Sequence, residues 1–327
     1  MIISRTPVRL SFFGGGTDYP LYYDREQGAI VGTTINKYIY ISLRKLSNFF
    51  DYNYRISYAK LELVKNTNDI IHPSVRECIR FLKIKDGLEI NIVSDLPART
   101  GLGSSSAFTV GLLNTLYASK GVMVSKRKLA NDAIKVEQDL IGERVGSQDQ
   151  FHAAFGGFNK FTFSRKSIDV FPLPITEKVG KRLNKQLLLF YTKRTRYASE
   201  ILREQLRNTE SGAKDEFLNK MYDMVDESIQ YLVNNDLESF GHLLDSSWNY
   251  KQELSTAISN KNINHWYLSA IKAGAYGGKL AGAGGGGFLM FVVPVDKKDA
   301  VRKALNNLLE VRFKFDNTGS QIIYYNN

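Results

Sequence analysis

Pro97–Phe108, with the sequence PARTGLGSSSAF, joins two segments that have different hydrophobic periods. In residues 88–92 apolar and polar side chains alternate, which predicts a β-strand. Apolar residues at helical spacing over 110–117 predict a helix, which ends at Gly121. The glycines and serines of Pro97–Phe108 therefore lie where a strand passes into the N-terminus of a helix.

This junction has the composition of an anion-binding loop. Gly101 and Gly103 have no side chain, so their N–H groups can approach an anion closely. The first N–H groups of a helix lack partners within it and carry the positive end of its dipole, which favours phosphate. Ser104, Ser105 and Ser106 add hydroxyl groups for phosphate oxygens or for a magnesium ion. A tight turn with a serine cap explains the same residues, and the stretch alone does not decide between the two.

The composition predicts an ordinary globular protein. The 327 residues are 43% hydrophobic and 24% charged, enough for two domains or one large one. No apolar run approaches the roughly 18 residues that cross a membrane, and the N-terminus lacks the pattern of a signal peptide. Cys78 is the only cysteine, so no internal disulfide forms. These features predict a cytoplasmic location without a membrane partner.

The net charge of +11 fits three alternatives. The positive charge could bind nucleic acid, attract anionic small substrates, or belong to a solvated, lysine-rich surface. Basic residues are scattered, apart from short groups such as 126–128 and 193–196, and no nucleic-acid-binding motif accompanies them. We therefore predict no nucleic-acid partner.

A second candidate loop lies near the N-terminus. Residues 8–13 alternate at the strand period, which places Arg9 on the face opposite Val8 and Leu10. A triple glycine and then Asp18 follow this strand. Glycines next to a carboxylate predict a loop that a ligand approaches closely, and a surface turn with an aspartate cap is the alternative.

Two further carboxylates attract attention. A helix is predicted over 126–144, and Glu137 lies within its apolar stripe. A carboxylate there is costly to bury unless it is paired or binds a cation, so a salt bridge and a magnesium site are both open. Asp149 follows twelve residues later. It either caps the next short helix or acts as a base beside Glu137.

The segment Gly274–Val293, GAYGGKLAGAGGGGFLMFVV, is the richest in glycine. It formally contains G-x-G-x-x-G, but these glycines precede a strand, whereas a dinucleotide-binding motif follows a strand and opens a helix. We expect the segment to pack closely against another glycine loop or a ligand, or to form a hairpin turn.

The domain boundary is predicted in or just after the polar stretch Ser164–Pro174, which gives domains 1–175 and 176–327. Helical patterns dominate the second domain. It is predicted to end in two strands, Arg312–Phe315 and Gln321–Tyr325, joined by a turn.

Three motifs stand in a recognisable order: P-x-R-L-S-F-F-G-G-G-T-D-Y at 7–19, P-A-R-T-G-L-G-S-S-S-A at 97–107 and K-L-A-G-A-G-G-G-G-F at 279–288. Over essentially its whole length the chain resembles the GHMP small-molecule kinases, named for galactokinase, homoserine kinase, mevalonate kinase and phosphomevalonate kinase. Within that family it resembles in particular the D-glycero-D-manno-heptose 7-phosphate kinases.

The resemblance implies an α+β, two-domain GHMP kinase fold. Its N-terminal domain would hold ATP at a left-handed βαβ-type site, and its C-terminal domain would be ferredoxin-like α/β. It further implies Mg²⁺ and transfer of phosphate from ATP to the anomeric hydroxyl of heptose 7-phosphate. The product would be the 1,7-bisphosphate, as the α anomer, for nucleotide-activated heptose and surface glycans. The resemblance is also compatible with a homodimer. A kinase for an unphosphorylated sugar such as L-fucose and a catalytically silent sugar sensor are the alternatives.

The resemblance also assigns residues. ATP binding falls to Pro97, Thr100, Gly101, Leu102, Gly103, Ser104, Ser105 and Ser106. The metal ligands would be Ser105 and Glu137, while Asp149 would lie beside the attacking hydroxyl and Arg9 near the transferring phosphoryl group. Substrate binding is expected at Gly15, Gly16, Thr17, Asp18, Arg196, Gly284 and Gly285.

One departure from the family bears on the sugar. Galactokinases carry G-E-H-T-D-Y at the first motif, and here Gly15 stands in place of their sugar-binding glutamate. This argues against galactose, whereas Asp18 is retained to accept hydrogen bonds from sugar hydroxyls. The phosphate of the sugar needs a cationic site, for which Arg196 is the first candidate, with Arg99 and Lys279 as others.

Overall fold

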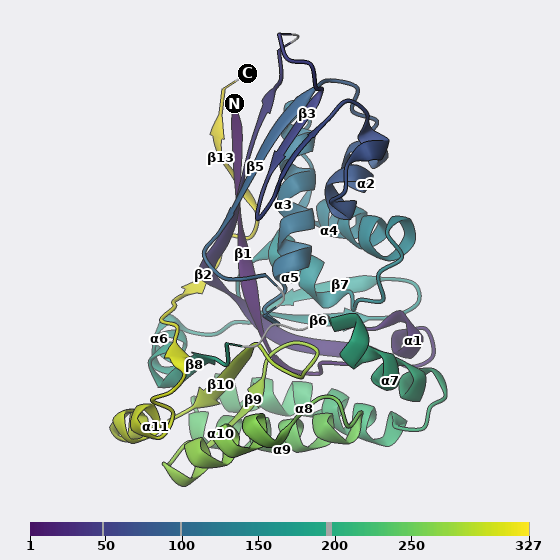
Figure 1. The fold of residues 1–327 in the computed structure, drawn as a ribbon. Helices are drawn as coiled ribbons and strands as arrows, with labels where there is room; N and C mark the ends of the chain where they lie inside the picture. The colour runs from purple at the N-terminus through teal and green to yellow at the C-terminus, as the bar shows by residue number, and fades with distance from the viewer. Residues whose placement is uncertain (48, 99, 194–197, 327) are drawn as a thin grey trace.

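The computed structural model describes residues 1–47, 49–98, 100–193 and 198–326, with only the backbone described for 198–202. Two sheets and their helices form two layers (Figure 1). The layers meet where α8 (Asp215–Val233) and α9 (Leu237–Glu253) pack on β1 (Ile2–Phe13), and where Lys279 of β9 (Gly277–Leu280) donates a hydrogen bond to the Phe12 carbonyl. Within the described residues, the larger sheet has nine strands in the central order β13-β1-β2-β5-β3-β4. Its remaining strands, β12 and β6, also pair with β2, and β7 pairs with β6.

The elements of the larger layer have the following bounds. Its other strands are β2 (Gly28–Lys45), β3 (Tyr54–Ser57), β4 (Leu61–Val64), β5 (Leu88–Ser94), β6 (Asn159–Phe163), β7 (Ile168–Pro172), β12 (Phe315–Asp316) and β13 (Gln321–Tyr325). Its helices are α1 (Pro20–Tyr23), η1 (Thr67–Asp69), α2 (Pro73–Phe81), α3 (Ser104–Ser119), α4 (Lys126–Ile134), η2 (Lys135–Leu140) and α5 (Gln148–Phe155).

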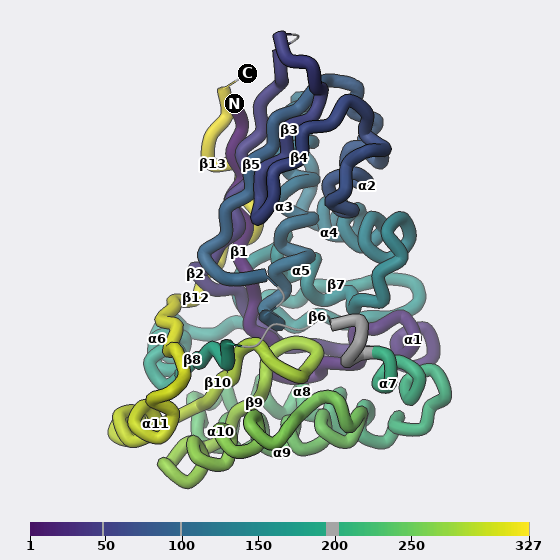
Figure 2. Tube along the Cα trace, viewed as in Figure 1, coloured from purple at the N-terminus to yellow at the C-terminus, as the bar shows by residue number. Residues whose placement is uncertain are grey.

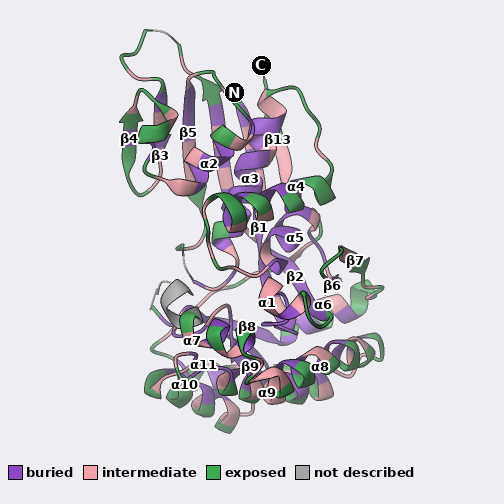
Figure 3. Cartoon of the chain, turned by 90° about the vertical axis from the view of Figure 1, so that its right-hand side faces the viewer, coloured by how far each residue is buried: buried purple, intermediate pink, exposed green. Residues whose placement is uncertain are grey.

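Helix α3 is the central support of this layer. It is apolar almost all round, as a fully buried helix must be, and it packs on both β1 and β2. Figure 3 shows the buried residues concentrated along α3 and the long central strands. The core includes Leu10 and Ile41 from the sheet and Leu113 from the helix, all fully buried. This packing fixes the N-terminus of α3, and with it the loop that precedes the helix.

The smaller layer is built on a four-stranded antiparallel sheet in the order β11-β8-β10-β9, counted over the described ranges. Its other strands are β8 (Leu187–Tyr191), β10 (Phe288–Val292) and β11 (Leu309–Glu310). The helices of this half are α6 (Glu177–Gln186), α7 (Ala198–Glu210), α8 (Asp215–Val233), α9 (Leu237–Glu253), α10 (Lys261–Lys272), η3 (Val295–Lys297) and α11 (Lys298–Ala304). A second core around Trp248 and Phe291 joins this sheet to its helices. Among the helices of the described ranges, none has the length and apolar character of a membrane span.

The end of the chain returns to the larger sheet, while the domain division 1–175 and 176–327 stays a prediction from the sequence. The tube in Figure 2 shows the C-terminal segment running back to the larger sheet. There β12 pairs with β2 and β13 pairs with β1, so the two C-terminal strands pair with different neighbours and not with each other. The two chain ends consequently lie side by side, and the Asn326 N–H donates to the Met1 carbonyl at 2.9 Å.

The two layers meet through glycine main chain. A Cβ atom on Gly282 would lie 2.4 Å from the Cα of Gly101, and one on Gly287 would lie 2.3 Å from the carbonyl oxygen of Thr100. Real Cβ atoms essentially never come so close to backbone, so these positions require glycine. The expectation that Gly274–Val293 packs against another glycine loop is confirmed.

Alanine at Gly282 tests how much this contact contributes. Gly121 is a matched control, because its φ of +69° resembles the +77° of Gly282 but nothing lies within 4 Å of its added Cβ. Gly121→Ala is expected to lower the free energy of unfolding by about 1–2 kcal/mol, the cost of a side chain at positive φ. Gly282→Ala adds an overpacking cost of about 1–3 kcal/mol. Equal decreases in the free energy of unfolding of the two variants, measured by urea denaturation, would contradict the close contact at Gly282.

Candidate active site

A cleft of about 900 Å³ lies where the two layers meet, a size suited to small-molecule ligands. It is lined by segments far apart in the sequence. They are Arg9 and Ser11 of β1, the loop 15–19, the loop 101–106, the segment 142–149, residues 203–206, Lys251 of α9, Lys279 of β9 and the glycine-rich loop 282–286. All three sequence motifs thus reach one cleft.

The loop before α3 turns its main chain toward this cleft. Gly101 and Gly103 have φ angles of +84° and +74°, which favour glycine, and Gly103 is the cap residue of α3. A Cβ atom on Gly103 would lie 3.2 Å from the side chains of both Arg9 and Asp149. The helix N-terminus therefore opens directly onto these two charged groups, in the arrangement that binds anions.

Not every residue predicted to bind ATP faces the cleft. Ser104, Ser105 and Ser106 line it with the two glycines. Leu102 is fully buried in the core, and its carbonyl accepts a hydrogen bond from the Arg9 N–H at 3.0 Å. The hydroxyl of Thr100 donates to the Pro97 carbonyl at 3.0 Å, which holds the turn together. These three residues shape the loop rather than line the cleft.

Arg9 and Asp149 form a paired charge in the centre of the site. The Nε and one terminal nitrogen of Arg9 donate to the two carboxylate oxygens of Asp149 at 2.7 and 2.9 Å. The other terminal nitrogen donates to the Gly101 carbonyl at 2.6 Å. A bidentate pair fixes the orientation of both side chains. Asp149 belongs to the first turn of α5, where the helix dipole also favours its negative charge.

Asp18 is buried beside this pair. Its carboxylate accepts hydrogen bonds from the Gly16 N–H at 3.0 Å and from the amide of Gln148 at 2.9 Å. Burial raises the pKa of Asp18, the Gly16 N–H lowers it, and the nearby charge of Asp149 raises it again. The predicted sugar-binding carboxylate and the predicted catalytic carboxylate are thus brought together.

Glu137 lies in a helical segment wider than an α-helix. The predicted helix 126–144 is confirmed as far as Leu140, but α4 ends at Ile134 and the chain continues as the π-helix Lys135–Leu140. The Ile141 N–H bonds to the Val136 carbonyl, the five-residue step of a π-turn. Such segments often occur at functional sites, and this one holds the carboxylate of Glu137 against α3 and α5.

The carboxylate of Glu137 is half satisfied. Its Oε2 accepts hydrogen bonds from Ser106 Oγ at 2.8 Å and from the amide of Gln150 at 2.5 Å. Its Oε1 is buried and has no hydrogen-bond partner among the described residues. Burial raises the pKa of Glu137 to about 7, although the nearby side chains of Thr109, Gln150 and Ser106 act to lower it. No salt bridge in the described part of the chain neutralises this group, so the salt-bridge alternative is wrong.

The serine that contacts Glu137 is not the one that the sequence predicted. Ser106, not Ser105, bonds to Glu137. Ser105 is exposed and lines the cleft. The structure therefore does not bring the two predicted metal ligands into contact, and their shared role stays a proposal.

Some of the predicted substrate-binding residues line the cleft and others do not. Gly15, Gly16, Asp18 and Gly284 line the cleft. Thr17 does not, since it is fully buried and its hydroxyl bonds to main-chain groups around the loop.

Gly285 is likewise absent from the lining. Its N–H donates to the Ile258 carbonyl at 2.9 Å. Arg196 and Arg99, the predicted phosphate-binding arginines, lie outside the described residues.

Sequence reasoning missed Lys251, Gln148 and Gln150. The two glutamines flank Asp149 in the motif G-S-Q-D-Q-F, and their buried partners, Asp18 and Glu137, give each a structural reason. Spacing around Asp149 could have suggested them. Nothing in the helical pattern around Lys251 marks it as a cleft residue, because only the tertiary fold turns it inward.

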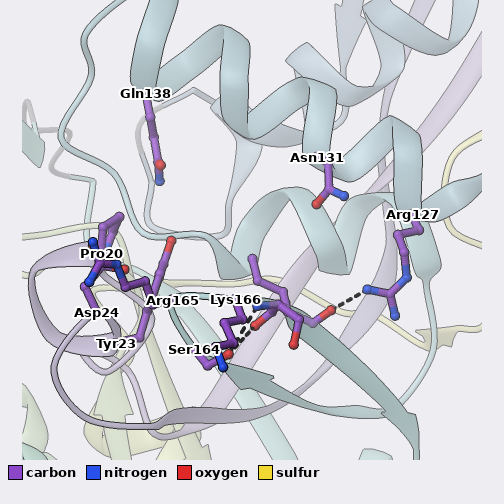
Figure 4. Close-up of a pocket in the computed structure, with 11 residues that line it drawn as sticks. Pro20, Tyr23, Asp24, Arg127, Asn131, Gln138, Ser164, Arg165 and Lys166 are labelled. Atoms are coloured by element: carbon purple, nitrogen blue, oxygen red, sulfur yellow. Dashed lines mark hydrogen bonds between the residues drawn. The ribbon is translucent and has the colours of Figure 1, made fainter.

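A second cavity, of about 440 Å³, is lined by a different set of residues. Figure 4 shows Arg127 and Asn131 on one side of it, Asp24 on the other, and Lys166 between them. Arg127 donates to the Ile168 carbonyl at 2.5 Å. This cavity has no glycine loop and no carboxylate pair, so the chemistry belongs to the larger cleft.

Comparison with known proteins agrees with this geometry. Residues 71–157 match the GHMP kinases N terminal domain, and residues 228–311 match the GHMP kinases C terminal domain. The chain is 32% identical over 317 residues to D-glycero-alpha-D-manno-heptose 7-phosphate kinase of Campylobacter jejuni, covering 93% of each protein. It is 24% identical to a galactokinase of Pyrococcus furiosus, covering 93% of this chain and 92% of that one.

Solved structures show the same fold. A D-glycero-D-manno-heptose 1-phosphate kinase from Bacteroides thetaiotaomicron superposes with a TM-score of 0.82 at 24% identity, over the whole of both chains. A putative sugar kinase from Campylobacter jejuni superposes with a TM-score of 0.74 at 29% identity, over 98% of each. The chain belongs to the GHMP kinase family and is an ATP-dependent sugar kinase.

The raised pKa of Glu137 makes a prediction about stability. An unfolded glutamate titrates near 4.5, so between pH 4.5 and about 7 the folded state holds a proton that the unfolded state has lost. Stability therefore falls as pH rises through this window. In Glu137→Gln this loss is absent. In urea denaturation without metal, the free energy of unfolding of Glu137→Gln relative to wild type should rise by about 3 kcal/mol from pH 4 to pH 8. Parallel curves would contradict the burial argument.

Proposed function

We propose that this sugar kinase transfers the γ-phosphoryl group of ATP to the anomeric hydroxyl of D-glycero-D-manno-heptose 7-phosphate, giving the α-1,7-bisphosphate. The observation that carries the proposal is the Arg9–Asp149 pair at the mouth of the glycine loop. The likeness to the Campylobacter jejuni heptose 7-phosphate kinase supports the choice of sugar. The cytoplasmic location and the homodimer stay predictions from the sequence.

In the proposed reaction the anomeric oxygen attacks the γ-phosphorus, the bond to the β–γ bridging oxygen breaks, and ADP leaves. Asp149 accepts the hydrogen bond of the attacking hydroxyl and takes up its proton as the new bond forms. Arg9 holds Asp149 in place through its bidentate contact and offsets negative charge on the transferring group. Positioning and electrostatic stabilisation supply most of the catalysis in reactions of this kind.

The ATP phosphates are proposed to lie on the main chain of Gly101–Ser106. The N–H groups at the start of α3 have no partner within the helix, and its dipole favours negative charge there. The serine hydroxyls add donors without adding charge. The contact between Gly101 and Gly282 keeps the loop from shifting when the anion binds.

Glu137 and the loop serines fit a magnesium ion. Mg²⁺ prefers hard oxygen ligands and takes few of them from the protein, using substrate phosphates for others. The buried and unpartnered Oε1 of Glu137 is such an oxygen. Within the described residues, no cluster of three or more His, Cys, Asp or Glu side chains could hold a metal. When bound, the ion would neutralise phosphate charge, with Glu137 and a hydroxyl of Ser105 or Ser106 holding it.

The sugar is proposed to lie against the loop of Gly15, Gly16 and Asp18. Asp18 has its carboxylate fixed by Gly16 and Gln148, ready to accept hydrogen bonds from sugar hydroxyls. Gly15 leaves space, because an added Cβ there would meet nothing within 4 Å. A seven-carbon sugar phosphate is larger than galactose, and that space favours it.

A panel of sugars tests the proposal. ADP release is measured with heptose 7-phosphate, the unphosphorylated heptose, L-fucose and D-galactose. Heptose 7-phosphate is expected to have the highest kcat/KM, with ³¹P NMR placing the new phosphate on the anomeric oxygen. Preference for L-fucose, or binding of ATP and sugar without ADP release, would overturn the proposed function.

Asp149→Asn tests the proton acceptor. Removal of a general base typically lowers kcat by about 10²–10⁴-fold. The asparagine keeps the size of the side chain, so the KM for ATP should change little. Asp139→Asn is the matched control, since Asp139 is an exposed aspartate outside the cleft lining. Near-normal turnover of a folded Asp149→Asn enzyme would remove Asp149 from the mechanism.

A further inference from the structure

Two lysines of the smaller layer are buried in the cleft without a carboxylate partner. Lys251 of α9 is 6% exposed and Lys279 of β9 is 3% exposed. Lys279 Nζ donates to the Phe12 carbonyl at 2.8 Å, and Lys251 Nζ donates to the Gly282 carbonyl. In the described part of the chain neither ammonium group forms an ion pair. Both lysines belong to the cleft lining.

Burying unpaired cations is costly, so these two residues are poor candidates for a purely structural role. Burial lowers the pKa of Lys251 to about 8, with the charge of Arg9 acting in the same direction. Burial, Lys251 and Arg9 together hold the pKa of Lys279 well below its usual range. The charge of Arg9 is already shared with Asp149. Asp18 favours the charged form of both lysines, but its own buried carboxyl has a raised pKa.

An anionic group of a bound ligand would neutralise the two lysines. The proposed substrates bring two such groups to the cleft, the phosphates of ATP and the phosphate of the sugar. The ATP phosphates already have the main-chain donors of Gly101–Ser106. Lys279 instead bonds to the end of β1 at Phe12, immediately before the triple-glycine loop, and Asp18 of that loop acts on both lysines. Lys279 therefore belongs with the sugar loop, whereas Lys251 lies within reach of both loops, because its Nζ donates to the Gly282 carbonyl and Gly282 contacts Gly101 of the nucleotide loop.

We propose that Lys251 and Lys279 form the binding site for the phosphomonoester of the sugar substrate. This inference rests on the proposed function, because an unphosphorylated sugar would bring no such anion. A phosphate dianion accepts hydrogen bonds from both ammonium groups and neutralises their charge. The two buried lysines therefore gain a charged partner only when the sugar carries a phosphate. The lysines thereby select a sugar phosphate over the free sugar.

The test compares Lys251→Met and Lys279→Met with wild type, using heptose 7-phosphate and unphosphorylated heptose as substrates. Lys272→Met, which changes an exposed lysine outside the cleft, is the matched control. A charge-assisted hydrogen bond contributes enough that each cleft variant should raise the KM for heptose 7-phosphate about 10–100-fold. The KM for ATP should change much less, and the ratio of kcat/KM for heptose 7-phosphate to kcat/KM for unphosphorylated heptose should fall by a similar factor.

A binding measurement keeps the proposal independent of turnover. With saturating non-hydrolysable ATP analogue, heptose 7-phosphate should raise the melting temperature of wild type and of Lys272→Met but not of either cleft variant. Without ligand, the methionine variants should melt no lower than wild type, because an unpaired buried charge is removed. Lys251→Arg keeps the charge and should retain most of the affinity.

Three results would overturn the assignment. A rise in the KM for ATP with unchanged KM for heptose 7-phosphate would place the lysines on the nucleotide. Loss of folding in the methionine variants without ligand would make the lysines structural. Equal use of phosphorylated and free heptose by wild type would instead overturn the proposed function, and the phosphate site with it.

Discussion

Two glycine loops in direct main-chain contact hold the site together. The loop of Gly101 and the loop of Gly282 come from different sheets, and no side chain separates them. Because each loop fixes the other, the N-terminus of α3 stays turned toward the cleft. Arg9 adds a second tie, from its side chain to the Gly101 carbonyl and from its main chain to Leu102. The cleft is therefore assembled by backbone, and its side chains are left free for chemistry.

The site is assembled with an incomplete charge balance. Arg9 is matched by Asp149, but Glu137 is buried with one oxygen unpartnered, and Lys251 and Lys279 are buried with carbonyl partners only. Burial of such groups without a charged partner is costly. The proposed ligands would supply the missing partners, a cation at Glu137 and an anion at the two lysines.

Local patterns predicted the elements around the loop well. The strand, loop and helix around Gly101 follow from periodicity and glycine placement, and all three are observed. Periodicity failed after Ile134, where a π-turn adds a residue to the helix and directs Glu137. At the C-terminus it predicted the strand Gln321–Tyr325 correctly but not its pairing with β1, which joins opposite ends of the chain. Lys251 turns inward only because α9 packs on β9, which no local pattern encodes.

The account is tested most directly by a crystal structure of the protein with a non-hydrolysable ATP analogue, Mg²⁺ and heptose 7-phosphate. It predicts the triphosphate on the N–H groups of Gly101–Ser106. The anomeric oxygen should lie within hydrogen-bond distance of Asp149 and in line with the γ-phosphorus, with the 7-phosphate near Lys279. Nucleotide bound elsewhere, or a sugar whose anomeric oxygen faces away from Asp149, would contradict the account.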